Sequence, residues 1–540
     1  WVAALDPASV KISDGIVTAA NIMNGGKISR NAEFSAQEHD NSFINLSADL
    51  TLNDWNLVPS LSYSEANSNL PTPLQRIEGE TIVTTGLNYG FDFGDDPVGG
   101  KHIERLTTSL DLSDPAAVPF RRYRIRPINS VDDDATFRFD ATRDMDFGSD
   151  NFKLTQLKTG VQITDRSRDY QRRDRNMVAR TGVTVGDDFY TVPIPSDSFS
   201  QLISEREHGW IGPDFRKFAQ GFVGSNNEFD SVFVQADDLV AVNADLQNSY
   251  TINEDVGAVY SRLDYESSFH NVPLRGNLGL RWVQTDTLVE GTVLTVATDA
   301  TGKATTIAAP TEFNGDYAEW LPSANFNFEL RDDVLLRLGI SKSMTRPSLA
   351  DLRTAVVPNS AFTSDVFERG QKAVDALNSP VTGVGGNPQL SPYVSTSLDS
   401  SLEWYFSEFG ALSVSGFHKD IKDFIASVEN IETLAFAVDP AKNSGITTLP
   451  VNVLIARPRN VGDATVTGFE LAYSDRMQNG LGVSTNLTFV KASVDNNGTE
   501  QQLQGVSDFS YTITPFYEQG PFEIHFNWTW RSKHNTSSNI

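Results

Sequence analysis

The chain has 540 residues and a formal charge of −27, from 70 acidic and 43 basic side chains. A chain this acidic is a poor partner for nucleic acid, because phosphate binding needs a basic surface. Its mean hydropathy is −0.30, and it contains no apolar run of the roughly 18 or more residues that indicate a transmembrane helix. The absence of cysteine is compatible with passage through an oxidising compartment.

The first 250 residues show two hairpins separated by long irregular stretches. Residues 1–40 are weakly patterned, with one strand expected at 16–23, and the first hairpin covers 44–63 with a tight turn at Asn53-Asp54. Residues 64–122 are expected to form a long loop with a short strand at 81–87, before a second hairpin over 135–163. Residues 166–250 form a second long loop, whose many aromatic residues predict that it folds on itself.

From residue 252 onward, strand-like runs follow one another, and short turns alternate with long loops. The turns are expected at 270–272, 331–333, 407–410, 477–480 and 518–520, and the long loops at about 291–315, 347–390 and 428–454. A β-sandwich would mix loop lengths at both ends. Short turns at one rim and long loops at the other are typical of a transmembrane β-barrel.

Strict alternation of apolar and polar residues gives each strand two unlike faces. Leu278, Leu280 and Trp282 share one face of their strand, while Arg281 lies on the other. Near the end of the chain, Phe522, Ile524, Phe526, Trp528 and Trp530 alternate with polar residues over 521–533. Such a face would promote aggregation in water but suits contact with lipid, with the polar face lining a wet lumen. A change of parity between Val414 and Phe417 predicts a bulge near Gly416. The pattern predicts an all-β fold, a large antiparallel transmembrane β-barrel.

Four stretches resemble the barrel of TonB-dependent outer-membrane receptors, most closely the group in Caulobacter- and Xanthomonas-like bacteria. They are residues 276–285, 321–352, 386–406 and 460–473. The resemblance implies a barrel of about 22 strands with a plug domain in its lumen. This chain has about fifteen expected strands and no plug or TonB-contacting sequence, so residues 1–540 are expected to be part of the barrel of a longer polypeptide.

The resemblance implies an outer-membrane protein of a Gram-negative bacterium that binds a scarce nutrient and imports it with energy from TonB. It implies contact with the TonB–ExbB–ExbD complex through the missing plug region, with outer-membrane lipid and lipopolysaccharide, and with a small nutrient. A surface lipoprotein is a further candidate partner. The resemblance favours an oligosaccharide as nutrient, with a ferric siderophore as the alternative. It implies no enzymatic activity and no cofactor. A passive porin and a secreted β-rich carbohydrate-binding protein are the other hypotheses.

Candidate ligand-binding residues lie in the aromatic and charged stretch 205–218 of the longest loop. Trp210 and Phe215 could stack on a sugar ring or an aromatic siderophore, with Asp214 and Arg216 providing hydrogen bonds. The alternative interpretation, which we favour, is that these aromatic residues form the loop's own small core.

Candidate plug-facing residues lie on the polar faces of the strands. They are Arg275, Arg281, Glu329 and Arg337, and a plug is a more plausible partner for them than a ligand because it fills most of such a lumen.

The remaining polar motifs do not indicate catalysis or metal binding. The run Asp132-Asp133-Asp134 lacks the glycine and distal glutamate of a calcium loop, so a solvated acidic surface is the simpler explanation. The seven histidines show no pair at metal-ligand spacing. Thr345-Arg346-Pro347 is interpreted as the structural end of a strand.

Overall fold

The computed structural model divides the chain into two compact units, each described below by itself. Unit 1 comprises residues 1–39, 68–129 and 171–245, and unit 2 comprises residues 40–67, 130–170 and 246–540. The structure describes residues 4–13, 16–23, 29–34, 36–70, 74–80, 88–93, 103–108, 110–111, 113–149, 151–173, 175–193, 203–206, 211–223, 232–235, 248–298, 304–358, 366, 370–375, 377, 380–438, 443–446, 448–496 and 499–535.

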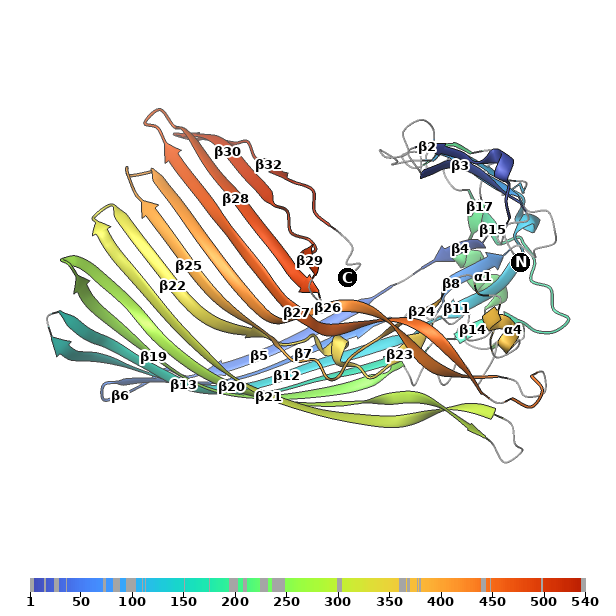
Figure 1. Ribbon diagram of the computed structural model, residues 1–540, viewed down its shortest axis with the longest axis horizontal. Helices are drawn as coiled ribbons and strands as arrows, with labels where there is room; N and C mark the ends of the chain where they lie inside the picture. Colours follow the sequence, from blue (N-terminus) through green and yellow to red (C-terminus); the bar gives the residue numbers. More distant parts are fainter. Residues whose placement is uncertain are drawn as a thin grey trace. The chain divides into compact units, whose positions relative to one another are not determined.

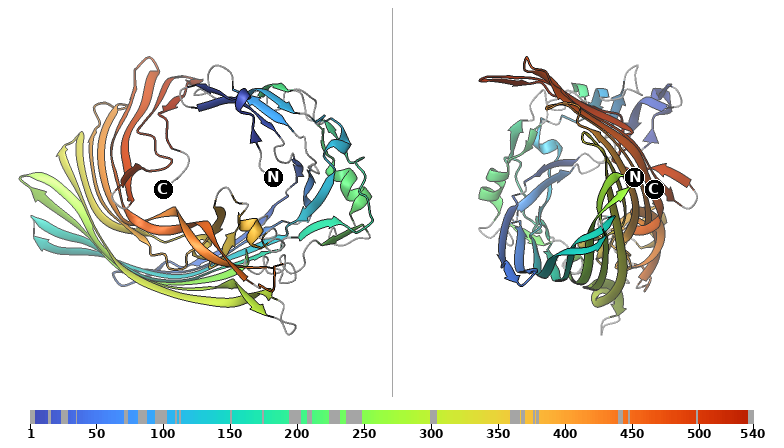
Figure 2. Two further views of the ribbon diagram at one scale, coloured as in Figure 1. Left: turned by 45° about the vertical axis from the view of Figure 1, so that its right-hand side comes forward. Right: turned by 90° about the vertical axis from the view of Figure 1, so that its left-hand side faces the viewer.

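Unit 2 is dominated by long antiparallel strands that form the wall of a barrel. In Figure 1 the long strands lie side by side, and from β19 to β28 their order across the sheet is their order in the sequence. Figure 2 shows that the sheet curves across its width. The wall strands are β5 (Glu38–Ser47), β6 (Leu50–Leu52), β7 (Trp55–Asn69), β12 (Ile128–Ser149), β13 (Phe152–Arg172), β19 (Tyr250–Phe269), β20 (Val272–Thr298), β21 (Ala304–Arg331), β22 (Val334–Thr345), β25 (Tyr393–Trp404), β26 (Ala411–Ala437), β27 (Thr448–Arg476), β28 (Leu481–Asn496), β29 (Thr499–Gln502), β30 (Phe509–Gln519), β31 (Phe522–His525) and β32 (Trp528–Arg531). The predicted transmembrane barrel fold is confirmed.

The register of the ladders gives the wall one apolar and one polar face, as the alternation predicts. Leu280 pairs with Pro322, and Arg281 pairs with Leu321 on the opposite face. The apolar side chains are exposed along the whole sheet, and they include Leu278, Leu280, Trp320, Ile340, Leu398, Leu402, Val414, Phe469 and Ile513. An exposed apolar surface of this extent fits hydrocarbon and not water.

Short turns join the wall strands at the positions expected from the sequence. β19 ends at Phe269 and β20 begins at Val272, and His270 and Asn271 between them both have positive φ angles, of 48° and 66°. Two consecutive residues of this kind form a tight hairpin whose twist matches that of the strands. Asn53, between β6 and β7, also has a positive φ, of 52°. The hairpins therefore lock the register that keeps each apolar side chain on one face.

Three expectations about the connections are wrong. Most of the loops predicted at 291–315 and 428–454 are strand, because β20 and β21 continue as a hairpin beyond the region that the apolar face covers, as do β26 and β27. The bulge predicted near Gly416 is also absent there: pairing is regular through that residue, and the irregularity lies between Ile421 and Phe424. The parity change has a packing reason, since the Phe417 ring occupies the space beside Gly468, where a Cβ would lie 2.6 Å from the ring.

The end of the chain also differs in detail from the sequence prediction. The strand expected over 521–533 is two strands, β31 and β32, which both pair with β30. Between them, the amide of Phe526 donates a hydrogen bond to the carbonyl of Pro515, at 3.0 Å.

The connection between β22 and β25 contains the short elements of unit 2. They are the 3₁₀ helix η3 (Leu349–Leu352), β23 (Val356–Pro358), α4 (Gln371–Asp375) and β24 (Val381–Gly385). Leu349, Leu352 and Leu390 of this connection are buried in one cluster with Ile252 and Val289 of the wall. No helix within the described residues has the length and apolar character needed to cross a membrane.

Unit 1 combines three stretches that the sequence analysis treated as separate. Its elements are β1 (Ala4–Leu5), η1 (Pro7–Ser9), β2 (Lys11–Ser13), β3 (Ile16–Met23), β4 (Ser29–Glu33), β8 (Leu74–Glu80), β9 (Tyr89–Asp92), β10 (Ile103–Thr108), η2 (Pro115–Ala117), β11 (Phe120–Ile125), β14 (Arg175–Ala179), β15 (Tyr190–Pro193), β16 (Ile203–Arg206), β17 (Ile211–Pro213), α1 (Phe215–Phe222) and β18 (Phe233–Gln235). One sheet has the order β18-β14-β11-β8-β4, so residues from all three stretches pair with one another. The strand expected at 81–87 lies outside the described residues.

An aromatic core holds unit 1 together. Tyr123 and Phe233 pack edge to face with ring centroids 4.7 Å apart, and Phe218 of α1 is fully buried among them. Met177 and Phe189 complete the same core. The prediction that the aromatic residues of 166–250 fold on themselves is confirmed in part, since their core is shared with strands β8 and β11.

A buried carboxylate lies beside this core. Glu78 is 6% exposed, and its carboxylate lies 2.5 Å from Arg122 Nε, 3.2 Å from Arg76 Nε and 3.5 Å from Arg124 Nη2. Burial by itself would raise the pKa of Glu78, but the hydrogen bond from Arg122 and the three positive charges outweigh it and hold the pKa below the usual 4.5. The ionised carboxylate thus joins β8 to β11.

We predict that unit 1 loosens in acid through Glu78. Because its pKa is lower in the folded state, the stabilisation is complete above pH 4.5 and is lost as the pH falls through the folded value. Glu78→Gln should lower the local free energy of opening by roughly 1–3 kcal/mol at pH 7. Hydrogen-exchange protection of the β11 amides measures this, and equal protection in variant and parent would contradict it. Glu33→Gln, on neighbouring β4, is the control.

We also predict a large difference between charges placed on the two faces of β20. Leu280→Lys should destabilise the barrel by about 2–4 kcal/mol, because a lysine on the lipid face must be dehydrated. Asn277→Lys, on the polar face of the same strand, should cost less than about 1 kcal/mol. Denaturant unfolding of the full-length protein in lipid vesicles measures both, and equal costs would show that the assignment of faces is wrong.

Candidate functional site

The polar face of the wall is the candidate functional surface of unit 2, and its charged residues are mostly paired within it. Arg275 forms an ion pair with Glu329 on the neighbouring strand. Arg337 Nε of β22 lies 2.8 Å from Glu403 Oε1 of β25, the strand that pairs with β22. All four predicted plug-facing residues lie on this face, but the charges of Arg275, Glu329 and Arg337 are already compensated in the wall.

Arg281 belongs to a basic pocket of about 330 Å³ on the same face. Its cationic residues are Arg138, Lys158, Arg262 and Arg281. Two of them have carboxylate partners, since Arg138 and Arg262 each lie 2.8 Å from an aspartate, Asp140 and Asp264.

The other two cations of the basic pocket lack such partners. Arg281 donates a hydrogen bond of 3.3 Å to the amide oxygen of Gln162. Within the described part of the chain, neither Arg281 nor Lys158 forms an ion pair. In a protein with a charge of −27, two uncompensated cations on a concave surface form a site for an anionic group.

Further along the same strands, a buried carboxylate joins three wall strands. Glu254 of β19 is 1% exposed, and its Oε1 lies 3.9 Å from Arg166 of β13 and 3.4 Å from Arg346, just after β22. Removing one partner of a buried ion pair is costly, because the other charge stays dehydrated. Arg346, interpreted from sequence as a strand end, thus fixes the direction in which Pro347 and η3 leave the wall.

Strand β27 holds the other end of this connection. Arg457 makes two hydrogen bonds to Glu432, of 2.7 and 2.8 Å, and donates a third, of 2.7 Å, to the carbonyl of Gly386. The Asn460 side chain bonds both the amide and the carbonyl of Ser391, each at 3.0 Å. Asn387 donates to the carbonyl of Pro458 at 3.1 Å. Residues 386–391 are therefore held firmly against the wall.

The structure gives two of the predicted ligand-binding residues structural contacts. Asp214 caps α1, accepting hydrogen bonds from the amides of Arg216 and Lys217 at 3.0 and 3.1 Å. The Phe215 ring packs against the unit 1 core and lies 6.1 Å from the ring of Phe34. The Arg216 side chain is exposed, and Trp210 lies outside the described residues.

The acidic run of β12 is paired across strands. Asp132 accepts two hydrogen bonds from Arg168, of 2.6 and 3.0 Å, and Asp133 accepts one of 2.9 Å from Tyr63. These contacts agree with the interpretation that the run is not a cation site.

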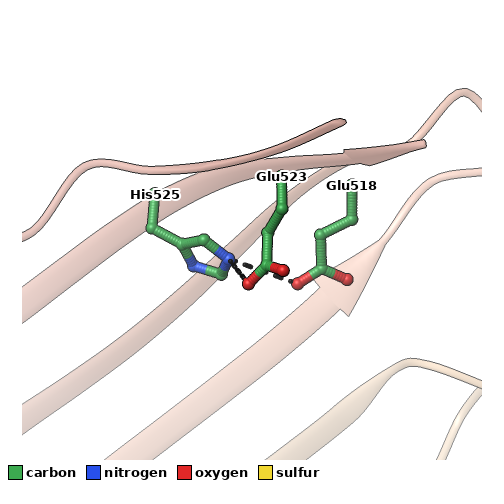
Figure 3. A group of neighbouring side chains, drawn as sticks. All are labelled: Glu518, Glu523 and His525. Atoms are coloured by element: carbon green, nitrogen blue, oxygen red, sulfur yellow. Dashed lines mark hydrogen bonds and ion pairs between the residues drawn. The ribbon is translucent and has the colours of Figure 1, made fainter. Parts of the chain in front are cut away.

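A cluster that sequence spacing did not reveal lies at the turn between β30 and β31 (Figure 3). The side chains of Glu518, Glu523 and His525 meet there, with His525 Nε2 3.0 Å from Glu523 and 3.4 Å from Glu518. The feature that brings the cluster together is the pairing register of β30 with β31, which places Glu518 directly opposite Glu523. Arg476 lies 3.6 Å from Glu518, so a guanidinium already offsets part of the acidic charge at this exposed cluster.

Comparison with known proteins agrees with this architecture. The family described as TonB dependent receptor-like, β-barrel, matches residues 75–539. No functionally curated protein matches the sequence.

Several solved structures are similar to the chain at low identity. The siderophore receptor PirA from Acinetobacter baumannii is 12% identical, with a TM-score of 0.34, over 93% of this chain and 68% of that one. The copper transporter OprC is 12% identical, with a TM-score of 0.42, over 95% and 62% of the two chains. The ferric-catecholate import receptor Fiu from E. coli K12 is 10% identical, with a TM-score of 0.42, over 93% and 62%.

The chain thus spans less than two thirds of the length of two of these three proteins. The family match covers most of the chain, and the wall has the strands, faces and turns of such a barrel. This chain belongs to the TonB-dependent receptor-like β-barrel family, whose members are outer-membrane proteins of Gram-negative bacteria.

Proposed function

We propose that the full-length protein is an active importer that binds a scarce nutrient outside the cell and is energised by the TonB–ExbB–ExbD complex. The observation that carries this proposal is the family match over residues 75–539. It makes a passive porin and a secreted carbohydrate-binding protein the weaker hypotheses. The work of such a protein is binding and movement of a plug, with no covalent step and no enzymatic activity.

A plug domain is the proposed partner of the polar face. Arg281 and Lys158 support this most directly, because they are the cations of the basic pocket without a carboxylate partner among the described residues. An acidic side chain of a plug would pair with them. Arg275, Glu329 and Arg337 would then contribute hydrogen bonds to the same surface while staying paired in the wall.

An oligosaccharide is the proposed nutrient, with a ferric siderophore as the second candidate. The resemblance of four stretches of the sequence to carbohydrate-associated receptors supports the first choice. In unit 1, Trp210 and Arg216 are the proposed ligand contacts, with Asp214 and Phe215 holding the helix that carries Arg216. A surface lipoprotein remains a further proposed partner, and outer-membrane lipid and lipopolysaccharide would contact the apolar face.

We predict that the basic pocket anchors the plug. The double variant Lys158→Gln, Arg281→Gln should make the plug of the full-length protein unfold at lower urea concentration, because one or two charge-assisted contacts are lost, each worth about 1.5–3 kcal/mol. A fluorescent label on the plug reports this transition, and the barrel transition should not move. Lys153→Gln, in an exposed pair with Asp146, is the control. An unchanged plug transition would show that the basic pocket does not bind the plug.

We predict that Trp210 contributes to sugar binding. Calorimetry of the detergent-purified full-length protein with neutral oligosaccharides and ferric siderophores should show saturable binding of a sugar. Trp210→Ala should weaken it by about tenfold, equivalent to about 1.4 kcal/mol, because a stacking surface is lost. Lys217→Ala, on the exposed side of α1, should bind normally. Binding to a ferric siderophore alone would show that the substrate is a siderophore and not a sugar. Sugar binding unaffected by Trp210→Ala would show that Trp210 is part of the loop's own core and not a ligand contact.

A further inference from the structure

A second pocket lies on the wall where the connection between β22 and β25 packs against it. This wall pocket has a volume of about 320 Å³ and is lined by Phe313, Tyr317, Leu352, Gln389 and Leu390, among others. Its size is at the lower end of the range for small-molecule sites, which begins near 300 Å³. One side is formed by β21 and the other by η3 and residues 388–391, so its shape depends on how firmly that connection is held.

An ion pair and two hydrogen bonds hold the connection that forms one side of the pocket. Glu254 holds Arg346 immediately before Pro347, which lines the pocket. Asn460 holds Ser391, which also lines it, through two hydrogen bonds. A pocket whose walls are fixed in this way loses little conformational entropy when a ligand binds.

The chemistry of the lining indicates an uncharged, hydroxyl-rich ring. Phe313 and Tyr317 offer aromatic surface, and Gln389 offers an amide that can accept hydrogen bonds from hydroxyls or donate to them. No cationic side chain is among the described lining residues, so the lining offers no charge that would compensate an anionic ligand. The pocket therefore fits one ring of a neutral sugar better than an anionic iron chelate.

Two buried hydroxyls lie beneath the aromatic surface of the pocket. The Tyr317 hydroxyl and the Thr285 hydroxyl are both buried, and neither makes a hydrogen bond of normal geometry among the described residues. The two residues are directly opposite each other on β21 and β20. Buried polar atoms normally have partners, and each of these hydroxyls has the other as its neighbour, through a side-chain interaction between Tyr317 and Thr285.

The position of the wall pocket along the strands suits a ligand that arrives from outside. Tyr317 lies about 45 Å along β21 from the short turn that follows Arg331. Even with the strong tilt of barrel strands, this exceeds the apolar band of about 25 Å. Ser323, which lines the basic pocket, is nearer to the short turn. A ligand would thus reach the wall pocket before it reached the level proposed for the plug.

We propose that the wall pocket is a subsite for one uncharged sugar ring of the imported oligosaccharide, stacked on Phe313 and bonded by the side chain of Gln389. This inference rests on the proposed import function and adds to it a site in the barrel wall. It assigns Glu254 as a positioning residue, which acts through Arg346 on the shape of the pocket.

Cysteine protection tests the subsite, because residues 1–540 contain no cysteine of their own and any cysteine elsewhere in the full-length protein can be replaced by serine. Gln389→Cys, at an exposed side chain of the pocket, is labelled with a fluorescent maleimide in the full-length protein. The probe is a mixture of neutral oligosaccharides from glucans, xylans and mannans, compared with oligogalacturonates and a ferric catecholate. Asn314→Cys is the matched control, since it lies on the opposite face of β21 from Phe313 and Tyr317.

Neutral oligosaccharides should slow labelling at residue 389 by at least about tenfold and leave residue 314 unaffected. Adding Phe313→Ala should abolish protection through loss of the stacking surface, and Glu254→Gln should weaken it without any change at the ring itself. No protection by the neutral mixture, or protection by the anionic probes alone, overturns the subsite. Equal protection at residues 389 and 314 overturns it as well.

Energy-dependent uptake, measured in parallel, distinguishes this inference from the proposed function. Uptake of neutral oligosaccharides without protection at residue 389 would remove the subsite and keep the importer. Protection at residue 389 without TonB-dependent uptake of any probe would keep the subsite and remove the importer.

Discussion

The constraint on which the structure depends is that every backbone amide and carbonyl in a lipid environment must find a partner within the protein. Long antiparallel ladders meet it, as in the pairing of β20 with β21 from Leu274 to Thr298. A ladder also forces side chains to alternate between two faces. The apolar face and the polar face of the wall are therefore two results of one requirement, and a single slip in register would exchange them. The tight turn at His270 and Asn271 matters because it excludes such a slip.

The polar face carries charged side chains, and these must be hydrated or paired. Arginines and glutamates that face a lumen are stable when paired, and Arg275 with Glu329 and Arg337 with Glu403 show pairing between adjacent strands. Such pairs compensate individual charges on the polar face and hold neighbouring strands together. Against this background, Lys158 and Arg281 stand out because both belong to one pocket and neither forms an ion pair within the described wall. An exception in a compensated surface is a better indication of a partner than the number of charges on it.

Sequence reasoning captured the wall because period-2 alternation is local and needs no knowledge of distant contacts. The faces of Leu280 and Arg281 and the turns after Phe269 and Arg331 could all be predicted. The parity of Phe417 led to the wrong prediction of a bulge near Gly416, because the position of its ring is explained by a space beside Gly468 on another strand. Unit 1 was missed for the same reason: Tyr123 and Phe233 meet in one core although they are far apart in sequence. Clusters such as Glu254 with Arg346 depend on register between strands, which spacing along one strand cannot reveal.

The resemblance and the aromatic surface of the wall pocket concern different residues, and the structure gives a reason. Three of the four resembling stretches meet around the connection after β22, through Asp351 with Asn387 and Ser391 with Asn460. These contacts bind backbone and carry no information about a ligand. Phe313 and Tyr317 lie outside all four stretches, yet they provide the aromatic surface of the wall pocket. Family membership can thus be encoded in the frame that holds the connection, while the choice of ligand depends on side chains that the frame leaves free to vary.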